Sequence, residues 1–224
     1  MISINNVRRE KSDMIDLGEE NTEIDEMELY LTEDLETEIA HGIEVSRLAG
    51  KLAKELKLDP DFCHDIEIAG MLHDIGKLRA STYLYGGEED TLNVEKMRYV
   101  RLHAGLGYEV VKEEGYSDRI CEMILHHHEN YDGTGYPDNL IGEQIPLGAR
   151  ILRICDVFVA LTSDRPYRKA FDNETAVELL IEEVRHFDMK IFLPFQSIVH
   201  EEILEREKAQ AEEKMMNTKE DKPS

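Results

Sequence analysis

The sequence predicts an all-α protein built as one helical bundle, and three observations lead to that prediction. Apolar residues recur at intervals of three to five along most of the chain, as on one face of a helix. The alternation typical of β-strands never extends far, and the breaks between periodic segments fall at glycine-rich turns. The 224 residues suffice for one domain with a well-buried core, so length requires no second domain.

The chain is expected to divide into an acidic arm over residues 1–30, a folded body over 31–207 and a polar tail over 208–224. The arm lacks apolar periodicity, so it is interpreted as a flexible segment or a short helix. The body begins with an amphipathic helix predicted over 31–58. That helix ends before Asp59-Pro60, a pair that caps and starts the next one.

The remaining elements of the body are further helices, separated by turn sequences. The breaks are Gly86-Gly87, Gly115 and the glycine-rich stretch from Asp132 to Pro137. The tail starts with a Lys/Glu-rich helical pattern and becomes polar toward its end. The predicted helices cover residues 62–73, 94–114, 117–128, 146–161, 174–184 and 191–207.

Composition limits the classes of partner. No apolar run approaches the roughly 20 residues that span a bilayer, and the N-terminus lacks the pattern of a secretory signal, so we expect no membrane insertion and a cytoplasmic location. A net charge of −23 argues against binding a long nucleic acid or an anionic membrane surface. A small anionic ligand remains compatible if metal ions and a few arginines reverse the field locally.

The three cysteines, Cys63, Cys121 and Cys155, lie in apolar helical segments and are too widely spaced to be paired metal ligands. We interpret them as buried free thiols.

Several of the nine histidines stand beside carboxylates at the ends of predicted helices. His73-Asp74 closes one apolar helix, and the run from His126 to Glu129 closes another. Asp156 lies inside the apolar segment ARILRICDVFVAL, where an ionised carboxylate needs a cation or several donors. Imidazole and carboxylate ligands without thiolate favour iron, manganese or zinc. Adjacent residues on a helix point about 100° apart, so His73 and Asp74 suit two nearby ions bridged by the carboxylate.

These motifs resemble those of the HD-GYP family of bacterial phosphodiesterases. Residues 73–77, HDIGK, match the HDxGK motif, and residues 127–137, HHENYDGTGYP, match HHExxDGxGYP. Residues 148–156 and 161–168 also resemble family segments in the same order, and agreement of several ordered motifs is far more specific than one. The resemblance covers about residues 35 to 200. It implies an HD-domain helical bundle with a C-terminal GYP extension.

The resemblance also implies the activity and the residues that perform it. The family hydrolyses cyclic di-GMP to linear pGpG, or further to GMP, with divalent metals: iron or manganese first, with zinc, nickel and magnesium as alternatives. Asp74 would bridge the metals, and Lys77 would contact the scissile phosphate. Tyr136 would shape the mouth of the site, while Arg165 and Arg168 would hold phosphate or guanine. The implied metal ligands are His41, His73, Asp74, His103, His127, His128 and Asp156.

Two departures from the family pattern bear on the site. Some members carry a glutamate one turn before the first histidine ligand, where this chain has Thr37, so we expect two metals rather than three. Residues 85–91 replace the usual Lys-Pro-Gly turn, and this change affects substrate access.

Other interpretations of the same residues stay open. His41 or His103 alone would ordinarily be a polar-face or core histidine, and His126 is interpreted as solvent-facing or as lying behind the ligands. Arg165 and Arg168 could instead end a helix with salt bridges. At the level of function, the rivals are an HD-type phosphohydrolase of another cyclic dinucleotide or nucleotide, and a catalytically silent binding module. A homodimer or a signalling partner protein is also left open.

Overall fold

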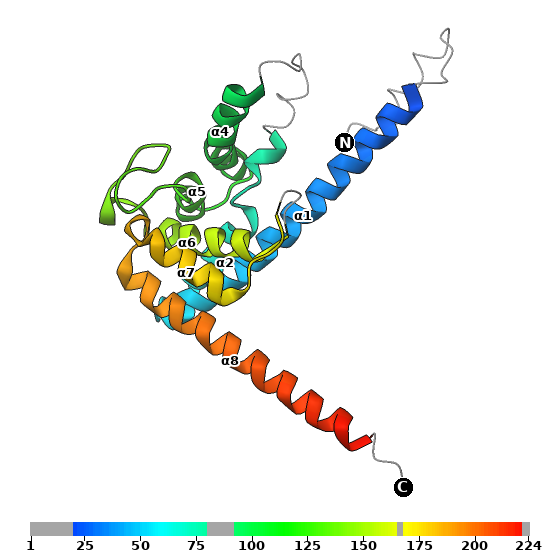
Figure 1. Cartoon of the computed structure of the whole chain (residues 1–224). Helices are drawn as coiled ribbons and strands as arrows, with labels where there is room; N and C mark the ends of the chain where they lie inside the picture. The colour runs from blue at the N-terminus through cyan, green and yellow to red at the C-terminus, as the bar shows by residue number, and fades with distance from the viewer. Residues whose placement is uncertain (1–19, 80–91, 165–167, 221–224) are drawn as a thin grey trace. The chain divides into compact units, whose positions relative to one another are not determined.

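The computed structural model describes residues 20–79, 92–164 and 168–220, which are helical for most of their length (Figure 1). No β-strand element occurs within those ranges, which confirms the predicted all-α class. The helices are α1 (Glu20–Glu55), α2 (Pro60–Leu72), α4 (Leu92–Glu113), α5 (Asp118–Leu125), α6 (Leu147–Thr162), α7 (Asn173–Glu182) and α8 (Met189–Glu220), with short 3₁₀ turns η3 (Gly142–Gln144) and η4 (Val184–His186).

Both terminal helices are longer than the sequence pattern indicated. Helix α1 begins at Glu20 instead of residue 31, and α8 continues to Glu220 through most of the expected polar tail. Apolar periodicity marks only the packed part of a helix, whereas a run of good helix formers can extend it without packing. The chain divides into two compact units, residues 1–38 and 39–224, and the second holds the core described below.

Helix starts follow local capping chemistry. Asp59 precedes Pro60 and its side chain accepts from the backbone N–H of Phe62, as predicted for this boundary. Ser117 and Asp172 cap α5 and α7 in the same way, each accepting from the backbone N–H three residues later. These caps satisfy amide donors that no helical carbonyl can reach.

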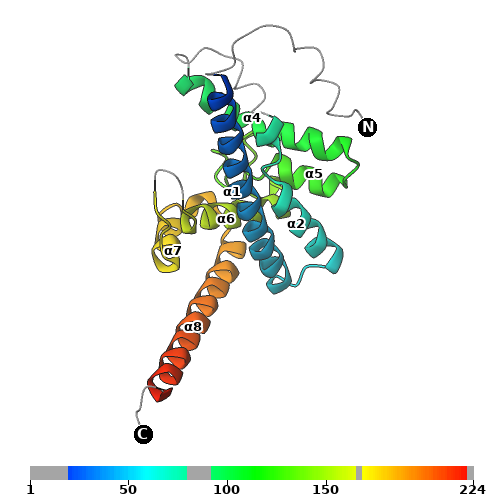
Figure 2. The same ribbon diagram turned by 90° about the vertical axis from the view of Figure 1, so that its right-hand side faces the viewer.

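The core of the second unit forms where α5 packs against α2, α4 and α6, and α6 in turn packs against α7 and α8 (Figure 2). Leu52, Ile66, Ile124 and Leu152 are fully buried there. Burying each such side chain contributes about 1.5–3 kcal/mol. Cys63, Cys121 and Cys155 are buried and free, as expected.

None of the described helices is long and apolar enough to cross a membrane.

Candidate metal centre

The predicted ligands come from distant parts of the sequence and meet in the second unit. His41 lies on α1, His103 on α4 and Asp156 on α6. His73 and Asp74 follow the last residue of α2, and His127-His128 stands just after α5. They form two groups of potential ligand atoms, one of His41, His73 and Asp156 and one of Asp74, His103, His127 and His128.

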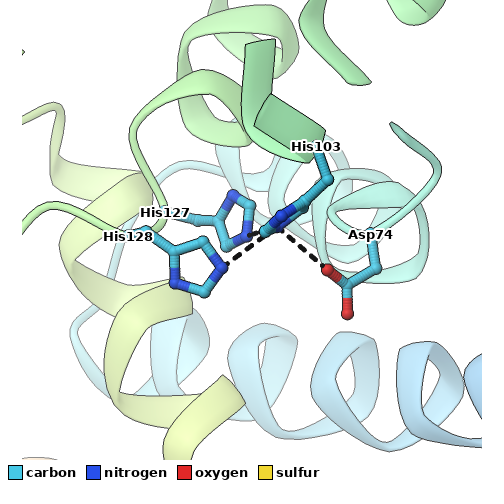
Figure 3. A group of neighbouring side chains, drawn as sticks. All are labelled: Asp74, His103, His127 and His128. Carbon is cyan, nitrogen blue, oxygen red and sulfur yellow. Dashed lines mark hydrogen bonds and ion pairs between the residues drawn. The ribbon is translucent and has the colours of Figure 1, made fainter. Parts of the chain in front are cut away.

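The second group has three imidazoles around one carboxylate (Figure 3). The Nε2 atom of His103 lies 3.2 Å from Oδ1 of Asp74. It also lies 3.2 Å from Nε2 of His127 and 3.0 Å from Nε2 of His128. Three ring nitrogens therefore converge on one small space.

The first group places two imidazoles against Asp156. The Nε2 atom of His41 is 3.0 Å from Oδ1 of Asp156, and Nε2 of His73 is 3.6 Å from the same oxygen. His41 and His73 are buried, and Asp156 is half-buried.

Asp74 joins the two groups through its two oxygens. Its Oδ1 faces His103, while its Oδ2 lies 3.2 Å from Nε2 of His73 and 4.0 Å from Nε2 of His41. A carboxylate in this position can donate one oxygen to each of two ions. The geometry therefore agrees with the bridging role that the resemblance implied for Asp74.

Backbone carbonyls orient two of the imidazoles. Nδ1 of His73 bonds to the carbonyl of Gly70 at 2.8 Å, and Nδ1 of His127 bonds to that of Ile124 at 2.6 Å. A ring that donates from Nδ1 keeps the lone pair of Nε2 for a metal. In both residues Nε2 is the atom that faces the cluster.

The residues present fit divalent cations. Nε2 of His73 is buried and makes no hydrogen bond, and the ring nitrogens of His103, His127 and His128 cannot all donate to one another. Converging lone pairs beside carboxylates are unfavourable alone, and a bound cation relieves them. All the donors are nitrogen or oxygen, which agrees with the expected borderline or hard metals.

Proton affinities differ between the two groups. Burial acts to lower the pKa of His73, but the charges of Asp74 and Asp156 outweigh it and raise that pKa well above 6.5. Burial, together with neighbouring imidazoles, holds the pKa of His127 well below 6.5, and burial lowers the pKa of His128 to about 3. The pKa of each carboxyl lies well below 3.8 despite burial. The charge of His73 is the main cause for Asp74, and the hydrogen bond with His41, followed by the influence of His73, is the main cause for Asp156.

A glycine sets the distance between the segment that follows α2 and helix α4. A Cβ on Gly76 would lie 1.9 Å from the carbonyl oxygen of His103 and 2.5 Å from the amide nitrogen of Gly107. Only glycine allows this approach of two backbones. The close contact keeps Asp74 within reach of His103.

Lys77 and Tyr136 lie at the cluster. Nζ of Lys77 is 2.7 Å from Oδ2 of Asp74, so its charge stands directly beside the proposed bridge. The ring of Tyr136 stacks on His128 with centroids 4.8 Å apart, and burial raises the pKa of its hydroxyl to about 12.

His126, which precedes the HHE motif, and Glu129, its last residue, are both buried and bonded to other parts of the protein. His126 is buried, not solvent-facing, and bonds to Glu122 at 3.2 Å; it lies outside both ligand groups. Glu129 is also buried, and its two oxygens accept from the backbone N–H groups of Asp138 and Leu140. Glu129 therefore anchors the loop that carries Tyr136.

The structure does not place the remaining predicted substrate-contacting residues at the cluster within the described ranges. Arg165 and residues 85–91 lie outside the described ranges. Arg168 donates to the carbonyls of Ala160, Leu161 and Lys169, which gives it a structural role at the C-terminal end of α6. Its contact with a substrate stays a prediction.

Sequence reasoning missed two arginines near the cluster. Arg153 lies on α6 three residues before Asp156, and its charge acts on His128 and Tyr136. The exposed Arg101 has its guanidinium carbon 5.6 Å from the centroid of the Tyr136 ring. The signal for Arg153 was its spacing, because residues three apart share one face of a helix.

Comparison with known proteins identifies relatives that are similar in sequence. The chain is 36% identical over 160 residues to a cyclic di-GMP phosphodiesterase of Pseudomonas aeruginosa, covering 71% of this chain and 38% of that protein. It is 40% identical over 142 residues to the cyclic di-GMP phosphodiesterase response regulator RpfG of Xanthomonas campestris pv. campestris, covering 61% and 36%. The chain thus spans well under half the length of these relatives.

Solved structures share the fold. The crystal structure of a cyclic GMP-AMP specific phosphodiesterase of V. cholerae superposes with a TM-score of 0.56 at 20% identity, covering 71% of this chain and 44% of that one. Residues 21–191 match the HD domain family, a span that includes all seven predicted ligands. The chain therefore belongs to the HD domain family, as the resemblance to HD-GYP proteins indicated.

Proposed function

We propose that this chain is a metal-dependent phosphodiesterase that hydrolyses cyclic di-GMP to linear pGpG, with GMP as a further product. The observation that carries the proposal is Asp74, whose two oxygens face the two separate ligand groups. The relatives at 36% and 40% identity are named for cyclic di-GMP hydrolysis. Because the chain spans only part of those proteins, substrate and regulation are proposed for this chain on their example.

Two divalent ions, iron or manganese first, would be held by the seven ligands. When bound, such a pair activates water and stabilises charge that develops on phosphorus. The chain's own residues supply the geometry: carbonyls of Gly70 and Ile124 hold the rings of His73 and His127 in register. Preorganised ligands cost no rearrangement during the reaction.

Lys77 would act on the scissile phosphate. Its ammonium is held by Asp74 at 2.7 Å and offers three donors, so it can neutralise a phosphate oxygen or give a proton to the departing alkoxide. Tyr136 would border the substrate with its aromatic face, since its ring already stacks on His128. Arg165 and Arg168 remain proposed contacts for phosphate or guanine.

The test is hydrolysis of cyclic di-GMP by anaerobically purified protein loaded with iron(II) or manganese(II), with the products identified. Asp74→Ala should lose turnover and metal together. Asp65→Ala is the matched control, because Asp65 is a carboxylate on α2, the helix that leads into Asp74, and it pairs with Arg119 instead of facing the cluster. The control should keep both.

The rival functions predict different results. Turnover of another cyclic dinucleotide, such as 3′3′-cGAMP, without turnover of cyclic di-GMP would favour an HD-type phosphohydrolase of other specificity. Two metals per chain with no cyclic dinucleotide cut would favour the silent binding module. Either result would contradict the proposed activity.

A further inference from the structure

Arg153 is a partly buried cation on the same face of α6 as the predicted ligand Asp156. The two residues are three positions apart in the sequence, and such residues are neighbours on a helix surface. Burial is the main influence on the guanidinium and lowers its pKa, while Asp156 and Tyr136 act to raise it. An arginine stays charged even when its pKa is lowered, so this cation borders the cluster at every working pH.

A chain of hydrogen bonds holds this guanidinium in place. Nε of Arg153 donates to Oδ1 of Asn130 at 2.9 Å. Asn130 in turn donates to Oγ1 of Thr134 at 3.0 Å, and that hydroxyl donates to Asp132 at 2.6 Å. The arginine is thus tied to the loop that follows the His127-His128 pair.

The two terminal nitrogens of Arg153 differ from its Nε in their hydrogen bonding. Within the described ranges no side chain or carbonyl accepts from them, and neither is enclosed. Arg150 gives the contrast, because it lies three residues earlier on the same helix and binds Asp188 at 2.6 Å. Arg150 is thus paired with a buried carboxylate, whereas the two terminal nitrogens of Arg153 remain available as parallel donors to a ligand.

The charge of the substrate class identifies what this donor pair would bind. A cyclic dinucleotide carries two phosphodiesters, and only one of them is cut at a time. The uncut phosphate brings a negative charge to a chain with a net charge of −23, so it needs a cation of its own. Lys77 is engaged by Asp74, and a guanidinium offers the parallel donors that match phosphate oxygens.

We propose that Arg153 binds the uncut phosphate of the cyclic dinucleotide and that Asn130 is the residue that positions it. The inference rests on the proposed function, since it assumes a substrate with two phosphates. It adds a binding residue from α6 to the predicted contacts of the segment around residue 165.

The test compares two substrates and three variants in the metal-loaded protein. Cyclic di-GMP has two phosphodiesters, and bis(p-nitrophenyl) phosphate has one and no base. Arg153→Gln should raise KM for cyclic di-GMP about ten- to a hundredfold, with kcat nearly unchanged and little effect on the small substrate. Asn130→Ala should raise the same KM less, and Arg119→Gln, an exposed arginine on α5 paired with Asp65, should change neither.

Two further readouts separate the mechanisms. Metal content should be the same in wild type and Arg153→Gln; loss of metal would show that Arg153 supports Asp156 instead and would overturn the proposal. KM of the wild type should rise with salt more steeply than that of the variant, because an ionic contact is screened. An unchanged salt slope would point to a contact with a neutral base and would also overturn it.

Failure of the inference can be told from failure of the proposed function. If wild type cuts cyclic di-GMP and Arg153→Gln matches it, the inference is wrong and the function stands. Equal loss on both substrates would move Arg153 to the scissile phosphate, contrary to the proposal. If wild type cuts bis(p-nitrophenyl) phosphate but no cyclic dinucleotide, the proposed function fails and the inference falls with it.

Discussion

The candidate metal centre and the anchoring carboxylates Glu129 and Asp188 satisfy buried charge in opposite ways. Glu129 and Asp188 have both oxygens bonded: Glu129 accepts from two backbone N–H groups, and Asp188 accepts from Arg150 and from the N–H of Lys190. In the metal centre, Nε2 of His73 has no hydrogen bond and imidazole nitrogens face one another. Buried charge that the protein satisfies itself supports the fold, whereas converging ligand atoms without hydrogen-bond partners mark a candidate cation site.

The largest effect is expected when a carboxylate is removed from either ligand group of the candidate metal centre. Asp156→Ala should lower phosphodiesterase activity by roughly a hundred- to a thousandfold, because charge stabilisation at the reacting phosphate is lost. Its metal content should fall from two ions toward one, while Asp74→Ala should lose both. The measurement is metal analysis beside the initial rate, and a variant with full metal content would contradict the assignment of Asp156.

Acidification should weaken the metal-free protein through its imidazoles. The pKa of His128 is lowered to about 3, so the unfolded chain takes up a proton below pH 6.5 that the folded chain refuses until about pH 3. Stability therefore falls as pH drops from 6.5 to 3, by an amount on the order of a few kcal/mol. His127, whose pKa is also lowered, acts in the same direction.

His73 should act in a different pH window. Its raised pKa contributes stability that is fully present below pH 6.5 and is lost as pH rises through the folded value. Urea unfolding of the chelated protein across pH 4 to 9 measures both effects. His128→Gln should reduce the loss of unfolding free energy at low pH. The same loss in that variant as in wild type would contradict the role of His128.

A change at Gly76 tests whether the centre depends on backbone packing. Gly76→Ala should destabilise the fold by about 3 kcal/mol, because the added methyl meets the backbone of α4 and must push it away. Metal affinity should fall with it, since Asp74 and His103 would separate. Gly105→Ala is the control on α4, where an added Cβ meets nothing within 4 Å.

The smallest effect is expected at an anchor. Glu129→Gln keeps one acceptor oxygen but turns an NH2 group toward the N–H of either Asp138 or Leu140, which then has no acceptor, and this should cost about 1–2 kcal/mol. Metal content should not change, because Glu129 belongs to neither ligand group. Thermal unfolding with metal analysis checks this, and loss of metal from the variant would show that Glu129 also supports metal binding.

Much of this protein was predictable because the controlling interactions are local. Asp59 and Pro60 start α2 through a cap within three residues, and the apolar periodicity of α6 follows from burial on one helix face. The motif residues also suggested seven metal ligands, and the structure gathers these seven side chains into the two groups. Periodicity did not locate the start of α1 at Glu20, because the sequence before residue 31 lacks the apolar repeat on which the helix prediction depended.

The sequence by itself determined the helices, their caps and the chemistry of the ligand set. Only the tertiary structure decided which ligands face each oxygen of Asp74 and that Gly76 sets the gap to α4. It also showed that Arg153 stands beside the cluster with two terminal nitrogens from which no described residue accepts a hydrogen bond. The sequence also could not show that the guanidinium of Arg168 donates to backbone carbonyls at the end of α6. The reason is physical: capping and periodicity act within a few residues, whereas the distance between Asp74 and His103 depends on how two helices pack.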